Sequence, residues 1–97
     1  MKKIRIYQSD NRNYTFMNYK FALDHGFNLD DYKQVADIDD DDTSDDLKIL
    51  DKIFMIGNDG TLTQHIKMRS ISVSDIIQID DRKYYVDSFG FKQIIGK

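Results

Sequence analysis

The stretch that decides the fold is Ser70-Ile71-Ser72-Val73-Ser74-Asp75-Ile76-Ile77-Gln78-Ile79, followed by Tyr84-Tyr85-Val86-Asp87-Ser88-Phe89-Gly90-Phe91. The polar residues Asp80-Asp81-Arg82 separate these two runs of β-branched and aromatic residues. Apolar runs on both sides of a short polar break predict two strands joined by a tight turn. A backbone kink at Gly90 would direct one of its flanking phenylalanines into the core and the other elsewhere. We expect the rest of the chain to pack on this hairpin.

The N-terminal part predicts one strand and one helix. Residues 2–8 alternate between polar and apolar, which is typical of a half-buried strand with Ile4 and Ile6 facing the core. Residues 14–17 predict a short extended piece. Asn18 is a favourable N-cap for a helix that runs through His25 and ends before a glycine.

The middle of the chain predicts a second strand and a second helix. Residues 31–38 alternate imperfectly, which favours an edge strand, and residues 39–42 predict a solvated loop because adjacent carboxylates repel each other. Thr43 or Ser44 is expected to cap a helix that ends before Gly57. Its apolar positions form a broad arc that packs in the core or serves as a partner surface: Leu47, Ile49, Leu50, Ile53, Phe54 and Ile56.

The order of these elements indicates the fold class. Without a repeated β-α-β spacing, the order β-α-β-α-β-β predicts an α+β fold, with two helices packed on a small, mainly antiparallel sheet. A chain of 97 residues without proline or a low-complexity linker predicts a single domain over residues 1–97. No cysteine is present, so disulfides, thiolate metal sites and cysteine nucleophiles are excluded. No signal-peptide core and no membrane-length apolar run is present, so we expect a protein of the bacterial cytoplasm.

Charge is the unusual feature of the composition. All 17 acidic residues are aspartates, and residues 30–46 contain nine of them with one lysine, a net charge of −8. The whole chain carries −3, so the remainder carries +5 by subtraction. A basic body with one strongly acidic segment indicates an electrostatic partner.

The hairpin also carries a family resemblance. Residues 71–77 and 84–92 resemble the C-terminal signature of the YodL-like domains, which occur in phage, plasmid and integrative-element genes of Firmicutes. The N-terminal half is similar more loosely, through residues 4–8, 14–17 and 31–35. The family supplies no catalytic residues to carry over. In size and charge the chain is also similar to the small type II anti-CRISPR proteins found in that genetic context.

Together these features predict a binding protein and not an enzyme. The leading hypothesis is a protein of a phage or mobile element that inhibits a Cas9-type nuclease, or its guide complex, by protein–protein contact without a cofactor. Such nucleases hold guide and target in positively charged channels, which an acidic segment can approach. The expected partner-binding residues are Asp39, Asp40, Asp41, Asp42, Asp45, Asp46, Tyr84 and Tyr85.

Two other binding functions compete with this hypothesis. A YodL-like accessory module can bind another host protein, such as a cytoskeletal or plasmid-maintenance protein. Alternatively, basic and aromatic side chains can form a surface for single-stranded nucleic acid. That surface would use Lys2, Lys3, Arg5, Arg12, Lys67, Arg69, Arg82 and Lys83, with Tyr7, Tyr84 and Tyr85.

Metal and catalytic sites have weaker support. Asp37, Asp39 and Asp41 have the spacing of an EF-hand loop, but Asp42 stands where that loop needs glycine and Lys48 where it needs glutamate. No metal site is therefore expected. A catalytic triad of Ser72 or Ser74 with His65 and Asp75, or a carboxylate pair of Asp75 and Asp87 beside Lys83, lacks a supporting motif. Turn hydrogen bonds explain Ser72 and Asp75 better, and Asp87 is expected to pair with a basic residue or with backbone N–H groups.

Overall fold

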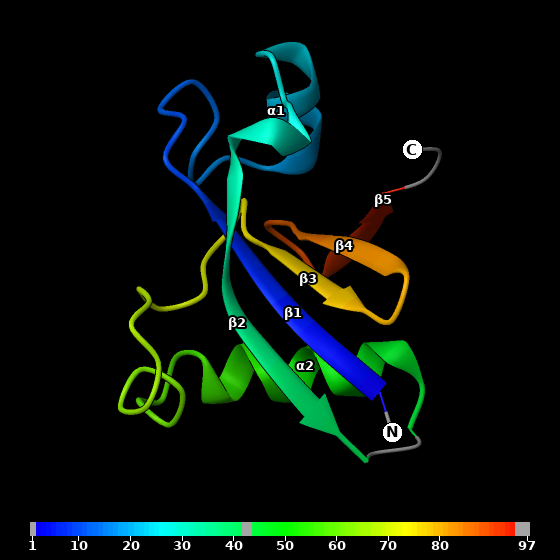
Figure 1. The fold of residues 1–97 in the computed structure, drawn as a ribbon. Helices are drawn as coiled ribbons and strands as arrows, with labels where there is room; N and C mark the ends of the chain where they lie inside the picture. Colours follow the sequence, from blue (N-terminus) through cyan, green and yellow to red (C-terminus); the bar gives the residue numbers. More distant parts are fainter. Residues whose placement is uncertain (1, 42–43, 95–97) are drawn as a thin grey trace.

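Five antiparallel strands form one sheet, and two α-helices pack against it (Figure 1). The computed structural model describes residues 2–41 and 44–94. Its elements are β1 (Lys2–Ser9), α1 (Tyr19–Asp24), the 3-10 helix η1 (Leu29–Asp31), β2 (Tyr32–Asp40), α2 (Asp46–Ile56), β3 (Ile76–Ile79), β4 (Arg82–Val86) and β5 (Phe91–Ile94). The predicted α+β class and its mainly antiparallel sheet are confirmed.

The strands lie in the order β2-β1-β3-β4-β5, so β1 is flanked on both sides. Ile4 pairs with Ile38 of β2 and with Ile79 of β3, which brings three isoleucines side by side across the sheet. Strand β2 is an edge, as its imperfect alternation predicted. Its register shifts by one residue, because Ile6 pairs with Ala36 whereas Tyr7 pairs with Gln34.

The predicted C-terminal hairpin is present. Strands β3 and β4 pair from Ile79 and Arg82 outward, and Asp80 takes a positive φ of 54° in the turn between them. Gly90 has φ +76°, the left-handed region that favours glycine. As expected, the two phenylalanines beside it diverge: Phe91 packs against the core, whereas Phe89 is 94% exposed.

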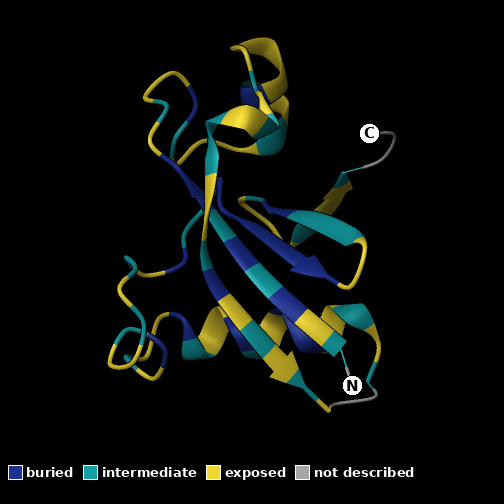
Figure 2. Cartoon of the chain, viewed as in Figure 1, coloured by how far each residue is buried: buried dark blue, intermediate teal, exposed yellow. Residues whose placement is uncertain are grey.

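Alternation along the strands gives the sheet one aliphatic and one aromatic face. Ile77 belongs to a cluster with Ile4, Ile6 and the buried α2 residues Leu50 and Ile53. The neighbouring Ile76 belongs to a second cluster, in which Tyr14, Ala22 and Tyr85 are buried beside α1. Figure 2 shows buried residues alternating with intermediate ones along β1, whereas the edge strand β2 carries mainly intermediate and exposed residues.

Only part of the apolar arc of α2 is core. Leu50 and Ile53 are buried, but Leu47 is 62% exposed and Phe54 36% exposed. The helix is capped by Asp45, whose side chain accepts a hydrogen bond from the Lys48 backbone N–H. The predicted cap Ser44 lies one residue too early, and Thr43 lies outside the described residues. No described helix is long and apolar enough to cross a membrane.

The extended piece predicted for residues 14–17 is wrong. The backbone N–H groups of Tyr14 and Thr15 both donate to the Asn11 carbonyl, so this segment is a turn. Phe16 takes a φ of +69°, and its N–H donates to the Ser74 hydroxyl at 3.0 Å. Ser74 itself has φ +87°. Local turn hydrogen bonds and one tertiary contact together override the β propensity of these aromatic residues.

Candidate functional site

The acidic segment lies where β2 ends and α2 begins, beside the N-terminal end of β1 (Figure 1). The loop predicted from Asp39 onward is wrong for two residues, because β2 continues through Asp40. Lys2 and Lys3 of β1 are the register partners of Asp40 and Asp39. Their positive charges offset the repulsion between adjacent carboxylates, which composition alone did not show.

Cations engage several of these carboxylates. The Lys3 ammonium lies 3.5 Å from Asp39, and the Lys52 ammonium on α2 lies 2.6 Å from Asp40. The Asp39 side chain nevertheless stays 56% exposed, whereas that of Asp40 is only 14% exposed. Asp40 therefore ties the sheet to α2, and Asp39 faces solvent.

Asp46 is an internal tie between α2 and β4. The Arg82 guanidinium donates to both of its oxygens, at 2.7 and 3.1 Å, and the Tyr84 hydroxyl donates to one of them. The Lys2 ammonium lies 3.8 Å away. Hydrogen bonding from Arg82 is the main reason that the pKa of Asp46 is lowered. Asp46 and Tyr84 thus bind each other within the chain, which leaves them less available to a partner than the sequence suggested.

Tyr85 points into the aromatic face and is fully buried. Its hydroxyl donates to the Met17 carbonyl at 2.7 Å, and burial raises its pKa. It is therefore not available to a partner at this surface. Asp42 lies outside the described residues. The predicted partner-binding residues that the structure leaves exposed are Asp39, Asp41 and Asp45.

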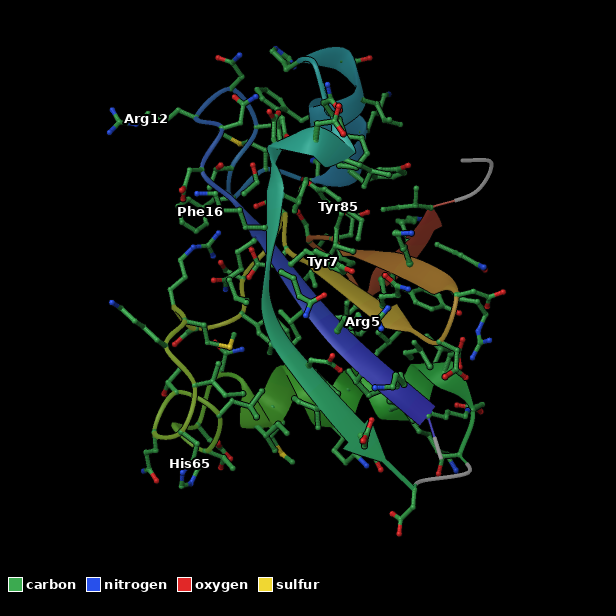
Figure 3. All side chains as sticks on the ribbon, in the orientation of Figure 1. Arg5, Tyr7, Arg12, Phe16, His65 and Tyr85 are labelled. Atoms are coloured by element: carbon green, nitrogen blue, oxygen red, sulfur yellow. The ribbon has the colours of Figure 1, made fainter. Side chains whose placement is uncertain are left out.

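The basic surface proposed for nucleic acid is only partly assembled. Arg5 and Tyr7 lie along β1 in Figure 3, but the Arg5 Nε is 3.9 Å from Asp37 and the Tyr7 hydroxyl donates to Gln78 at 3.1 Å. Arg12 points outward from a turn (Figure 3). Ion pairs with carboxylates of the chain engage four of the other predicted cations, Lys2, Lys3, Arg69 and Arg82.

A buried carboxylate lies at the other end of the sheet, where Asp75 precedes β3. The Arg69 Nη2 is 3.0 Å from one of its oxygens, and Gln8 donates to the other at 3.1 Å. The Ser72 backbone N–H also donates to it at 3.0 Å, so the predicted turn hydrogen bond is confirmed. Burial outweighs these bonds and raises the pKa of Asp75. The contact with Arg69 had no signal in the sequence beyond the opposite charges.

Ser72 contacts Asp75 through its backbone N–H, but in the described residues no contact with His65 completes the suggested triad. No hydrogen bond or ion pair in the described parts of the chain joins His65 to Asp75, and His65 lies on an outer loop (Figure 3). Asp87 accepts hydrogen bonds from the Tyr19 and Ser88 backbone N–H groups at 3.2 and 2.8 Å. Of the two expected arrangements for Asp87, the structure shows the one with backbone donors.

The acidic segment also forms no metal site among the described residues. Asp37 and Asp39, which have the EF-hand spacing, lie within strand β2 and not in a loop. Within residues 2–41 and 44–94, no three acidic or histidine side chains are grouped so that they could hold a metal ion.

Comparison with known proteins gives one relationship. The model of the YodL-like domain family matches residues 3–96, nearly the whole chain. No curated protein and no solved structure shows significant similarity to the chain.

Proposed function

Because the chain belongs to the YodL-like domain family, we propose that it is a non-enzymatic binding protein of a phage or other mobile element. Its proposed target is a Cas9-type CRISPR nuclease in the bacterial cytoplasm, which it inhibits by protein–protein contact. Three exposed carboxylates at one end of the molecule carry this proposal: Asp39, Asp41 and Asp45.

These carboxylates suit a basic groove for two physical reasons. The first is placement, since Asp39 is a paired residue of β2 opposite Lys3 and Asp45 caps α2, so that ordered elements hold both positions. The second is the spacing of the charges, since Asp39 lies two residues along one strand face from Asp37, a further exposed carboxylate, at about 6.7 Å. This distance between the two carboxylates is roughly twice the rise between successive charges along one strand of a nucleic acid. The segment can therefore occupy a channel that holds guide or target strands.

The test titrates the purified protein into a DNA-cleavage reaction of a Cas9-type nuclease, with addition before or after the guide RNA. The double substitution Asp39→Lys and Asp41→Lys should raise the half-inhibitory concentration by about tenfold, equivalent to about 1.4 kcal/mol of binding free energy. Dependence on the order of addition would locate the blocked step.

The matched control is Asp10→Lys with Asp24→Lys, which changes net charge equally at exposed sites outside the segment. It should leave inhibition unchanged. If the segment variant folds and inhibits as well as the original protein, the acidic segment is not the contact. If the original protein inhibits none of several homologous nucleases, the target is another host protein.

A further inference from the structure

The outer edge of β5 is open. In the part of the chain that the structure describes, β5 is the last strand of the sheet and pairs only with β4. An open edge presents backbone N–H and C=O groups to which another extended chain can pair. In Figure 1 this edge faces away from β2, the other edge strand.

Each face of the sheet has a hollow beside the start of β5. On the α2 side, a hollow of about 210 Å3 is lined mainly by the apolar side chains of Phe54, Val86 and Phe91, with Asp51. On the α1 side, a hollow of about 410 Å3 is lined by Lys20 and Lys92, together with Asn18 and Phe89. One hollow is thus suited to an apolar side chain and the other to an acidic one.

Carboxylates do not cancel the basic character of the second hollow. Asp87 and Ser88 line both hollows, and the Asp87 carboxylate accepts from the backbone N–H groups of Tyr19 and Ser88. Its single negative charge offsets only one of the two lysines, so the lining of the second hollow stays net positive. Asp51 lines only the apolar hollow, where its charge disfavours an acidic side chain.

The turn between β4 and β5 is braced and displays an aromatic ring. The Asp87 N–H donates to the Gly90 carbonyl at 3.0 Å, and the Asp87 carboxylate joins the turn to the start of α1. Phe89, at 94% exposure, contributes little to the core. A large aromatic side chain on a braced turn beside two hollows is the kind of group that anchors protein interfaces.

We propose that the β5 edge accepts an extended segment of a partner protein whose side chains alternate between apolar and acidic. Successive side chains of a strand point to opposite faces. In an added strand, one set therefore enters the hollow beside Phe54 and Phe91, and the other set faces Lys20 and Lys92. Backbone pairing supplies affinity and the two hollows supply specificity. This inference deepens the proposed function, since it describes the segment that the partner supplies, at the edge opposite the acidic segment.

The probe is a short fluorescent peptide of alternating leucine and aspartate, titrated with the full chain and followed by anisotropy. We expect it to bind about tenfold more tightly than a peptide of equal composition with its aspartates and leucines in separate blocks. Methylation of every second peptide nitrogen on the pairing side should abolish binding, because it removes backbone donors.

Two variants of the chain test the hollows. Lys92→Asp and Phe89→Ala should each weaken binding by about fivefold or more. Their matched controls, Lys33→Asp on β2 and Leu47→Ala on α2, are also exposed and should bind normally. Equal affinity for both peptide orders, or full binding by Lys92→Asp, would overturn the proposal.

The assay contains no nuclease, so its failure is separate from a failure to inhibit cleavage. A second copy of the chain could also supply the added strand, because its β2 stretch Asp37-Ile38-Asp39 alternates acidic and apolar residues. Sedimentation of the chain alone measures whether it self-associates. If the chain self-associates and Lys92→Asp prevents it, the β5 edge serves a second copy and the proposal of a partner protein is overturned.

Discussion

Two aspartate–arginine pairs lie at opposite ends of the sheet, and they differ mainly in burial: Asp46 with Arg82 joins α2 to β4, and Asp75 with Arg69 fixes the segment before β3. In the pair of Asp46 and Arg82, the side chains are 20% and 36% exposed. In the pair of Asp75 and Arg69, the carboxylate is fully buried and the arginine side chain is 33% exposed. The charges are the same, but the pKa of Asp46 is lowered by its hydrogen bonds, whereas burial raises that of Asp75.

The difference shows that burial decides whether a carboxylate of this chain holds the fold together or remains at the surface. The buried Asp75 depends on its partners, because an unpaired charge in a low-dielectric site is strongly unfavourable. Asp46 retains access to water, so its ion pair stabilises modestly. Carboxylates with still greater exposure, such as Asp39, are the ones on which the proposed contact depends.

The largest expected effect follows from breaking the buried pair. Arg69→Met keeps an apolar stem but leaves Asp75 without its cation, and should lower the free energy of unfolding by about 3 kcal/mol at neutral pH. Urea denaturation measures this change. The double variant Arg69→Met with Asp75→Leu should be more stable than the single variant, because it removes the orphaned charge. If the two variants are equally unstable, packing and not charge explains the loss.

Breaking the more exposed pair of Asp46 and Arg82 should lower the stability less. Arg82→Met should lower the free energy of unfolding by about 1 kcal/mol, because water solvates the Asp46 carboxylate that it leaves behind. Arg12→Met, on an exposed turn, is the control and should change stability by no more than about 0.5 kcal/mol. A loss from Arg82→Met as large as that from Arg69→Met would remove the distinction between the two pairs.

Local sequence patterns were enough to predict most of the fold. Alternation gave β1, and the polar break at Asp80 gave the β3–β4 hairpin. The Asn18 cap gave the start of α1, because its side chain accepts from the Phe21 N–H three residues later. These signals are short-range. The turn around Phe16 was missed because a hydroxyl 58 residues away supports it in addition to the local hydrogen bonds to Asn11.

The candidate site was predicted less completely, since its state depends on contacts between distant segments. Composition identified the acidic segment, but only strand register shows that Lys3 faces Asp39. Tyr84 and Tyr85 are neighbours in sequence, yet strand alternation sends them to opposite faces of the sheet. Arg69 and Asp75 are six residues apart, and no local rule marks that pair as buried.

The smallest expected effect is on how the free energy of unfolding changes with pH, where Asp46 and Asp75 should act in opposite directions. The lowered pKa of Asp46 means that its stabilisation is present above the unfolded-state pKa and is lost as pH falls through the folded-state value. The raised pKa of Asp75 gives the opposite behaviour: its contribution is present below the unfolded-state pKa and is lost as pH rises through the folded-state value.

Asparagine substitutions at the two positions separate these contributions. The stability difference between the original protein and Asp46→Asn should shrink as urea denaturation is repeated at lower pH. The difference for Asp75→Asn should instead shrink as pH rises. Each trend is limited to about 1.4 kcal/mol per unit of pKa difference. Slopes of the same sign would mean that both carboxylates are governed by their hydrogen bonds, and that burial does not control Asp75.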